Sequence, residues 1–120
     1  MNQPELNEGE IYAGAIIKPD GTGHHIILLP GDNDDAEWKD QMDWAKSIGG
    51  DLPSRPELAL LYAGIKDQFQ PVWYWSNEPH ESSSYNAWGQ SFFNGGQSGW
   101  YKDYDNRARA VRRVIIEMEA

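Results

Sequence analysis

The chain contains no cysteine. This absence excludes disulfides, thiol catalysis and zinc sites with thiolate ligands. Basic residues are also scarce, with ten Lys and Arg against nineteen Asp and Glu and a formal net charge of −9. Such a protein repels nucleic acid and anionic membranes, because affinity for both depends on Lys and Arg near phosphates. No apolar run approaches the ~20 residues of a membrane span, and no signal-peptide pattern follows Met1, so we expect synthesis in the cytoplasm and no membrane insertion.

The chain does contain enough apolar material for one folded domain. Hydrophobic residues make up 39% of the 120 positions and aromatic residues 12%, which is typical of a globular protein and unlike a disordered one. Residues 1–9 are polar and include Pro4 and Gly9, so we expect a loose tail there. Residues 10–120 are predicted to form a single domain.

Several segments have the composition of β-strands. Apolar runs at 11–17 and 24–29 flank the turn sequence Lys-Pro-Asp-Gly at 18–21, and we expect them to pair as a hairpin. After Pro71 the pattern changes to period two, and Asn-Gly-Gly at 94–96 is a strong hairpin-turn signal. Four later strands are therefore expected, at 72–76, 85–92, 100–102 and 108–116.

Two helices are expected between these groups of strands. The segment Asp32-Asn33-Asp34-Asp35 precedes apolar positions with helical spacing, which predicts a helix at about 36–48 with its N-cap in that segment. Ser54 and Glu57 form a capping-box pattern that opens a second amphipathic helix at about 55–66. This order predicts an α+β domain, in which both helices cover an antiparallel sheet of early and late strands and the termini lie near each other.

The most informative stretch is aromatic. Ten of the fifteen Trp, Tyr and Phe residues lie between Trp73 and Tyr104, interleaved with Gly, Asn, Ser and Gln. Large rings beside small or hydrogen-bonding side chains form surfaces that recognise ligands or partners. No nucleophile motif accompanies them, so the sequence indicates binding rather than catalysis.

A set of short motifs carries a family resemblance. They are Leu52-Pro53-Ser54-Arg55-x-Glu57-Leu58, Tyr74-Trp75-Ser76, Ala87-Trp88, Phe92-x-x-Gly95, Lys102 and Arg109-Ala110-Val111-Arg112. In this order, over about residues 10–114, the chain resembles the C-terminal domain of collagen-like bacterial adhesins, a family with a C-type-lectin-like fold found in bacterial and prophage proteins. The resemblance implies binding, often of carbohydrate, without shared catalytic residues. It also implies a bacterial phage or prophage particle as the setting, although this chain carries no collagen-like stalk.

The resemblance also sorts the aromatic residues. It implies that Trp75, Trp88 and Phe92 occupy recurring core positions. Trp73 and several other rings match no such position, which leaves them available for recognition. We predict a ligand site on loops 77–86 and 94–107. Its candidate residues are Asn77, His80, Tyr85, Asn86, Trp100, Tyr101, Tyr104 and Asn106.

Metal sites and a basic surface are alternatives to an aromatic site. Lectins of this fold class often use calcium, but Asn77-Glu78-Pro79 lacks the Glu-Pro-Asn order of calcium-dependent sugar sites, and the acids at 32–35 lack the Gly and Glu of an EF-hand loop. We expect no metal or other cofactor, with calcium as the open alternative. His24 and His25 are adjacent on a strand and should point to opposite faces. Four of the five Arg lie at 107–113, where they form either a basic stripe or, as we favour, ion-paired strand residues.

Three functions are compatible with these features. The first is a non-enzymatic recognition module of a phage or prophage particle, at a tail fibre or tip, that binds a host-surface glycan. The second is a structural or assembly component of the phage tail whose aromatic residues pack on a protein partner. The third is a glycan-degrading enzyme, which would need two carboxylates flanking the sugar. In each case we expect a homo-oligomer, with a trimer as the first hypothesis.

Overall fold

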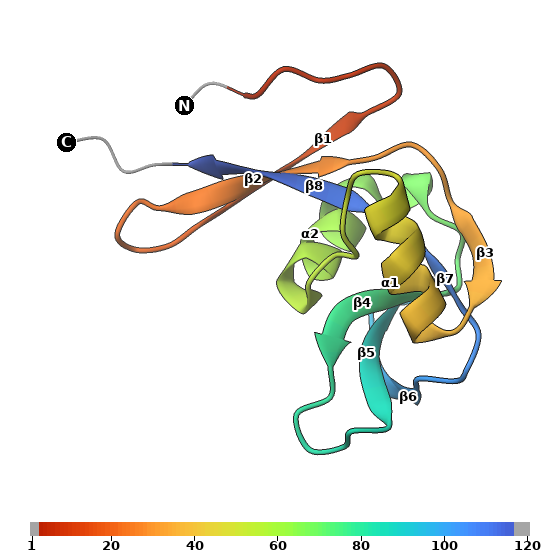
Figure 1. Ribbon diagram of the computed structural model, residues 1–120. Coiled ribbons are helices and arrows are strands. Elements are labelled where there is room, and N and C mark those ends of the chain that lie inside the picture. Colours follow the sequence, from red (N-terminus) through yellow and green to blue (C-terminus); the bar gives the residue numbers. More distant parts are fainter. Residues whose placement is uncertain (1–2, 117–120) are drawn as a thin grey trace.

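A computed structural model describes residues 3–116; the expectations for residues 1–2 and 117–120 lie outside it. Over these residues the protein is an α+β domain with two helices and two sheets (Figure 1). Its elements are β1 (Ile11–Ile17), β2 (Gly23–Leu28), β3 (Asn33–Ala36), α1 (Trp38–Ser47), α2 (Arg55–Ile65), the 3-10 turn η1 (Lys66–Gln68), β4 (Trp73–Pro79), β5 (Asn86–Ser91), β6 (Gln97–Tyr101), β7 (Asn106–Ala108) and β8 (Val111–Ile116). No helix in the described range is long and apolar enough to span a membrane.

The smaller sheet joins both ends of the chain. Its strand order is β1-β2-β8, and all neighbours are antiparallel. The predicted hairpin turn is confirmed, because the Gly21 backbone N–H donates to the Lys18 carbonyl at 2.9 Å and Gly21 has a φ of 89°. Figure 1 shows this sheet extending away from the rest of the domain. Early and late strands therefore share a sheet, as the sequence predicts.

The larger sheet has the strand order β3-β7-β4-β5-β6 and is mixed, because β4 and β7 pair in parallel. Tyr74 and Trp75 in β4 are both fully buried and belong to different core clusters. Tyr74 packs with Leu58 and Leu61 of α2, whereas Trp75 packs with Ala45 of α1. Successive strand residues point to opposite faces, so the two helices cover opposite faces of this sheet.

The start of α1 differs from the sequence-based expectation. Residues 33–36 form β3 and pair with β7, instead of supplying an N-cap. Glu37 is the N-cap, and its side chain makes no capping hydrogen bond. The fully buried Gln41 explains the difference, because its amide nitrogen donates to the carbonyls of Asp34 and Asn106 at 2.8 and 2.9 Å. One helical side chain thus fastens β3 to β7.

The start of α2 confirms the capping box. The Ser54 hydroxyl accepts from the Glu57 backbone N–H, and the Glu57 carboxylate accepts from the Ser54 N–H at 2.8 Å. The expected last strand at 108–116 is in fact interrupted at residues 109–110, where the chain passes from β7 in the larger sheet to β8 in the smaller one. There the Arg109 guanidinium donates to the carbonyls of Gln68 and Leu29 at 2.6 and 2.8 Å.

The expected core positions are confirmed in part. Trp75 and Phe92 are 0% and 4% exposed and lie in the two core clusters. Trp88 is only half-buried and belongs to neither cluster, so its assignment to the core is wrong. It lies on the same face of β5 as Gln90, where the side chains of Arg55 and His80 cover it instead of the core.

Candidate ligand-binding surface

A hollow of about 460 Å³ lies where β5 begins and β6 ends. It is lined by Ser84, Tyr85, Tyr101, Lys102 and Asp103, and we call it the tyrosine pocket. Tyr85 and Tyr101 are 78% and 68% exposed, which is far more than a packing role requires. The sequence-based site therefore contains two residues that do border one concave surface.

Hydrogen bonds hold the walls of the tyrosine pocket in place. The Lys102 backbone N–H donates to the Tyr85 carbonyl, and its ammonium group donates to the Ser84 carbonyl, each at 2.8 Å. The Lys102 ammonium also lies 4.9 Å from the centre of the Trp38 ring, within cation–π range. A second hollow of about 540 Å³, lined by Glu37, Trp38, Lys39, Lys102 and Asp103, adjoins the first through its two shared residues.

A third hollow, of about 270 Å³, involves other members of the predicted site. We call it the tryptophan pocket. Its lining residues are Asp35, Gln70, Val72, Trp73, Trp100, Tyr104, Asp105, Asn106 and Arg107. Trp100 lies between two other rings, with centroids 5.2 Å from Trp73 and 4.6 Å from Tyr104. Because Asn106 is only 4% exposed, it is a wall residue and not the surface loop residue that the sequence suggested.

His80 and Asn86 belong to neither pocket. The His80 ring stacks on Trp88 with centroids 4.6 Å apart and an interplanar angle of 17°. The Arg55 guanidinium lies 3.5 Å from the Trp88 ring centre, so Trp88 is covered by two side chains from distant segments. Gly99 leaves room for this arrangement, because a Cβ there would lie 2.9 Å from the His80 ring and 3.6 Å from the Asn86 amide nitrogen.

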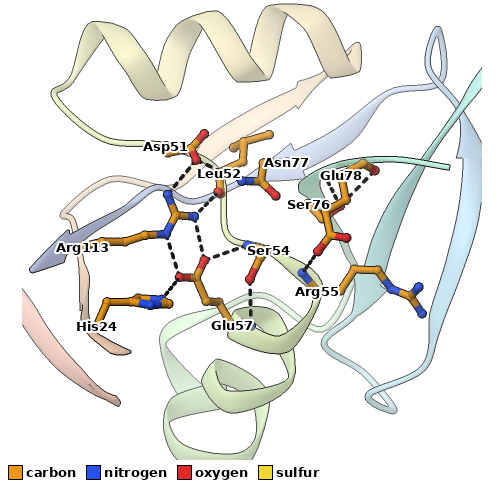
Figure 2. A network of polar contacts seen from close by, with 10 residues as sticks. All are labelled: His24, Asp51, Leu52, Ser54, Arg55, Glu57, Ser76, Asn77, Glu78 and Arg113. Carbon is orange, nitrogen blue, oxygen red and sulfur yellow. Dashed lines mark hydrogen bonds and ion pairs between the residues drawn. The ribbon is translucent and has the colours of Figure 1, made fainter. Parts of the chain in front are cut away.

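Asn77 lies apart from the other predicted site residues, within a network of polar contacts around the start of α2 (Figure 2). Its amide donates to the Asp51 carboxylate at 3.0 Å, and its backbone N–H donates to the Pro53 carbonyl at 2.8 Å. The next residue, Glu78, accepts from the Arg55 backbone N–H at 2.7 Å. Asn77 therefore positions the loop before α2.

Arg113 is at the centre of this network, as Figure 2 shows. It donates to both oxygens of Glu57 at 2.7 Å and to Asp51 at 2.7 Å. His24 lies 2.6 Å from the Glu57 carboxylate. Burial opposes ionisation of Glu57, but the hydrogen bonds from Arg113 and the Ser54 N–H outweigh it and lower the pKa of Glu57 to about 2.

The other C-terminal arginines are engaged in a similar way. Arg107 bonds Asp32 at 2.8 Å and lies 3.2 Å from Asp34, and Arg112 bonds Glu10 at 2.9 Å. Together with the carbonyl contacts of Arg109, these pairs confirm that the arginines are ion-paired strand residues and do not form a basic stripe.

The Tyr74 hydroxyl donates to Asp32, the same carboxylate that pairs with Arg107. Burial is the larger cause and this hydrogen bond the second, and together they raise the pKa of Tyr74 to about 12.

The histidines behave as strand geometry predicts. The His24 ring contacts Glu57, whereas the His25 ring is 2.8 Å from the Tyr12 hydroxyl. Within residues 3–116, no group of three or more His, Asp or Glu side chains is placed to hold a metal ion.

Sequence reasoning missed several pocket residues. Ser84, Lys102, Asp103 and Trp38 were not among the candidates, although they line the tyrosine pocket or the hollow beside it. The available signal was weak, because Ser, Lys and Asp are common on any surface. Trp38 also looked like an ordinary member of an apolar helical face, and it does pack partly against the second core cluster.

No family model matches the sequence, and no curated protein is significantly similar to it. The resemblance to the adhesin family therefore rests on the sequence motifs alone.

Proposed function

We propose that this protein is a non-enzymatic recognition module that binds carbohydrate in the tyrosine pocket. The observation that carries the proposal is the high exposure of Tyr85 and Tyr101 beside one hollow. Exposed aromatic rings can stack on the apolar faces of sugars, and here two of them border one hollow that also has polar lining residues. The C-type-lectin-like identity of the fold, and the setting on a phage or prophage tail, form part of this proposal and rest on the family resemblance.

The polar groups of the pocket suit sugar hydroxyls. The Lys102 ammonium has three donors and spends one on Ser84, and the nearby Asp103 carboxylate is an acceptor. Lys102 is also held against Trp38, so its position is fixed before a ligand binds. Such preorganisation reduces the entropic cost of binding.

Two observations bear on the alternative functions. Ile17 and Ile115 are 48% and 70% exposed and lie on the outer strands of the three-stranded sheet. Exposed apolar side chains there favour contact with a protein partner, which is what an assembly component requires. A glycan-degrading enzyme would need two carboxylates flanking the sugar, whereas among residues 3–116 Asp103 is the one carboxylate that lines the tyrosine pocket. We therefore rank recognition first, assembly second and glycan hydrolysis third.

The test is binding of the labelled protein to a glycan array and to host cells. A Tyr85→Ala, Tyr101→Ala double variant should lose at least about tenfold in affinity, or ~1.4 kcal/mol, without unfolding. Phe93→Ala is the matched control, because Phe93 is 75% exposed and lies outside the pocket. Undiminished binding by the folded double variant would refute the site and leave assembly as the better explanation.

A chelator adds a second arm to the same experiment. If the pocket binds sugar through rings and fixed polar groups, EDTA should leave the affinity unchanged. Loss of binding with EDTA, and its recovery with calcium, would instead establish the calcium-dependent alternative.

A further inference from the structure

The aromatic walls of the tryptophan pocket can attract a cation. The Trp100 ring stands at 67° to Trp73 and at 33° to Tyr104, so three aromatic surfaces with different orientations meet around one hollow of about 270 Å³. Ring faces carry negative electrostatic potential and attract ammonium groups that come within ~6 Å of the ring centre. Tyr104 is 49% exposed, which leaves the pocket open to solvent on its side.

The charges around this pocket are predominantly negative. Asp35 and Asp105 line it, and neither forms an ion pair with another described residue. Arg107 also lines it, but its side chain is 15% exposed and its guanidinium already pairs with Asp32 and Asp34. The positive charge is therefore compensated, while two carboxylates stay available.

Two buried hydrogen-bond donors at the tryptophan pocket have no acceptor among the described residues. Asn106 is 4% exposed, and its amide nitrogen has no hydrogen-bond partner within residues 3–116. The indole nitrogen of Trp100 is likewise buried without a partner. Buried donors normally have acceptors, and both of these residues line the same pocket. A hydroxyl or carbonyl oxygen of a bound molecule would supply one to the Asn106 amide once that side chain turns towards the hollow.

We propose that the tryptophan pocket binds an organic ammonium ion that also carries a hydroxyl or carbonyl oxygen. The aromatic walls and Asp35 and Asp105 receive the ammonium group, and the oxygen faces Asn106. This site is separate from the tyrosine pocket and does not depend on carbohydrate binding there. The turn at 101–106 joins the two, since Tyr101 to Asp103 border one pocket and Tyr104 to Asn106 the other.

The test uses pairs of small molecules that differ in charge. Choline is compared with 3,3-dimethylbutan-1-ol, which has the same shape and no charge, and D-glucosamine is compared with D-glucose. Binding to the full chain is followed by indole N–H chemical shifts and by calorimetry. At least one ammonium compound should bind tenfold or more tightly than its neutral partner. Tighter binding of choline or of glucosamine would identify a quaternary or a primary ammonium group. Equal affinities within both pairs, or no binding by either ammonium compound, would overturn the proposal.

Variants locate the site without disturbing the core. Tyr104→Ala removes an exposed wall, and Asp35→Asn with Asp105→Asn removes the two charges at exposed positions; each should weaken ammonium binding at least fivefold. Asp20→Asn also removes a negative charge, in the turn between β1 and β2 and outside this pocket, and should have no effect. The Tyr85→Ala, Tyr101→Ala variant should bind ammonium normally. Equal weakening by Asp20→Asn would show a general effect of charge and refute the site.

Discussion

Trp100 and Tyr101 are adjacent in β6, yet their side chains point to opposite faces of the strand and border different pockets. Tyr101 pairs with Asn86 and lines the tyrosine pocket, whereas Trp100 pairs with Ala87 and lines the tryptophan pocket. The period of a strand requires this separation. A double substitution at these two residues would therefore damage two sites at once, and single substitutions are needed to assign a function to either.

The same separation predicts different effects on stability. Trp100 is half-buried and packs against the second core cluster, so Trp100→Ala should lower the free energy of unfolding by about 2–3 kcal/mol. Tyr101 is 68% exposed, and Tyr101→Ala should stay within about 0.5 kcal/mol of the wild type. Denaturant unfolding of the two variants measures this. A similar loss in both would mean that Tyr101 packs more closely than its exposure indicates.

Alanine substitution should lower the free energy of unfolding more at a core aromatic residue than at a half-buried one. Trp75→Ala and Phe92→Ala remove rings that are 0% and 4% exposed and should each cost about 3–5 kcal/mol. Trp88→Ala removes a half-buried ring stacked with Arg55 and His80 and should cost less than about 2 kcal/mol. Thermal melts compare the three variants. If Trp88→Ala costs as much as Phe92→Ala, the ring is part of the core after all.

Features fixed by local chemistry could be predicted from the sequence. The capping box at Ser54 and Glu57 and the turn ending at Gly21 each need only a few consecutive residues, and both are present as expected. The α+β class followed from the periodicity of longer segments. Elements that depend on distant partners were missed: residues 33–36 have little intrinsic strand preference, and they form β3 because Gln41 and β7 supply their contacts.

The sequence predicted which types of residue form the candidate site, but it did not predict which of them lie together. Loop position and aromatic character correctly selected Tyr85 and Tyr101 as exposed rings. The same criteria also selected Asn77, which bonds Asp51 in a structural network, and Asn106, which is buried. Which side chains face one another depends on sheet register and on contacts such as His80 with Trp88, and no single segment of sequence encodes these.

Two glycines should respond to alanine in opposite directions. A Cβ at Gly50 would lie 2.6 Å from the Val111 carbonyl oxygen and 2.6 Å from a Leu29 methyl group, so Gly50→Ala should cost about 1–3 kcal/mol through overpacking. Gly64 in α2 has open space around it, and Gly64→Ala should stabilise the protein by about 0.5–1 kcal/mol. Urea titrations of both variants measure the difference. Destabilisation by Gly64→Ala would indicate that this face of α2 contacts something else.

Self-association should involve the three-stranded sheet. Ile115 is 70% exposed on the outer strand β8, and Ile17 is 48% exposed on the other outer strand, β1. The expected species in sedimentation at high concentration is a homo-oligomer, with a trimer as the hypothesis drawn from the family resemblance. Ile115→Asp should shift it towards monomer, while Phe93→Asp, an equally exposed position elsewhere, should not. A wild-type monomer at all concentrations would reject the idea.

Glu57 should make the domain sensitive to acid. Its pKa falls from 4.5 to about 2 on folding, so the carboxylate stabilises the folded state fully above about pH 4.5, and this contribution disappears as the pH falls towards 2. The shift corresponds to about 3 kcal/mol, and the side chain is 1% exposed, so solvent screens it little. Glu57→Gln should therefore lower the unfolding free energy at pH 7 and flatten its decline between pH 4.5 and 2. Glu10, whose pKa is also lowered to about 2 by its hydrogen bond to Arg112, will keep a residual slope in this variant. Parallel curves for the wild type and Glu57→Gln would show that Arg113 gains nothing specific from this carboxylate.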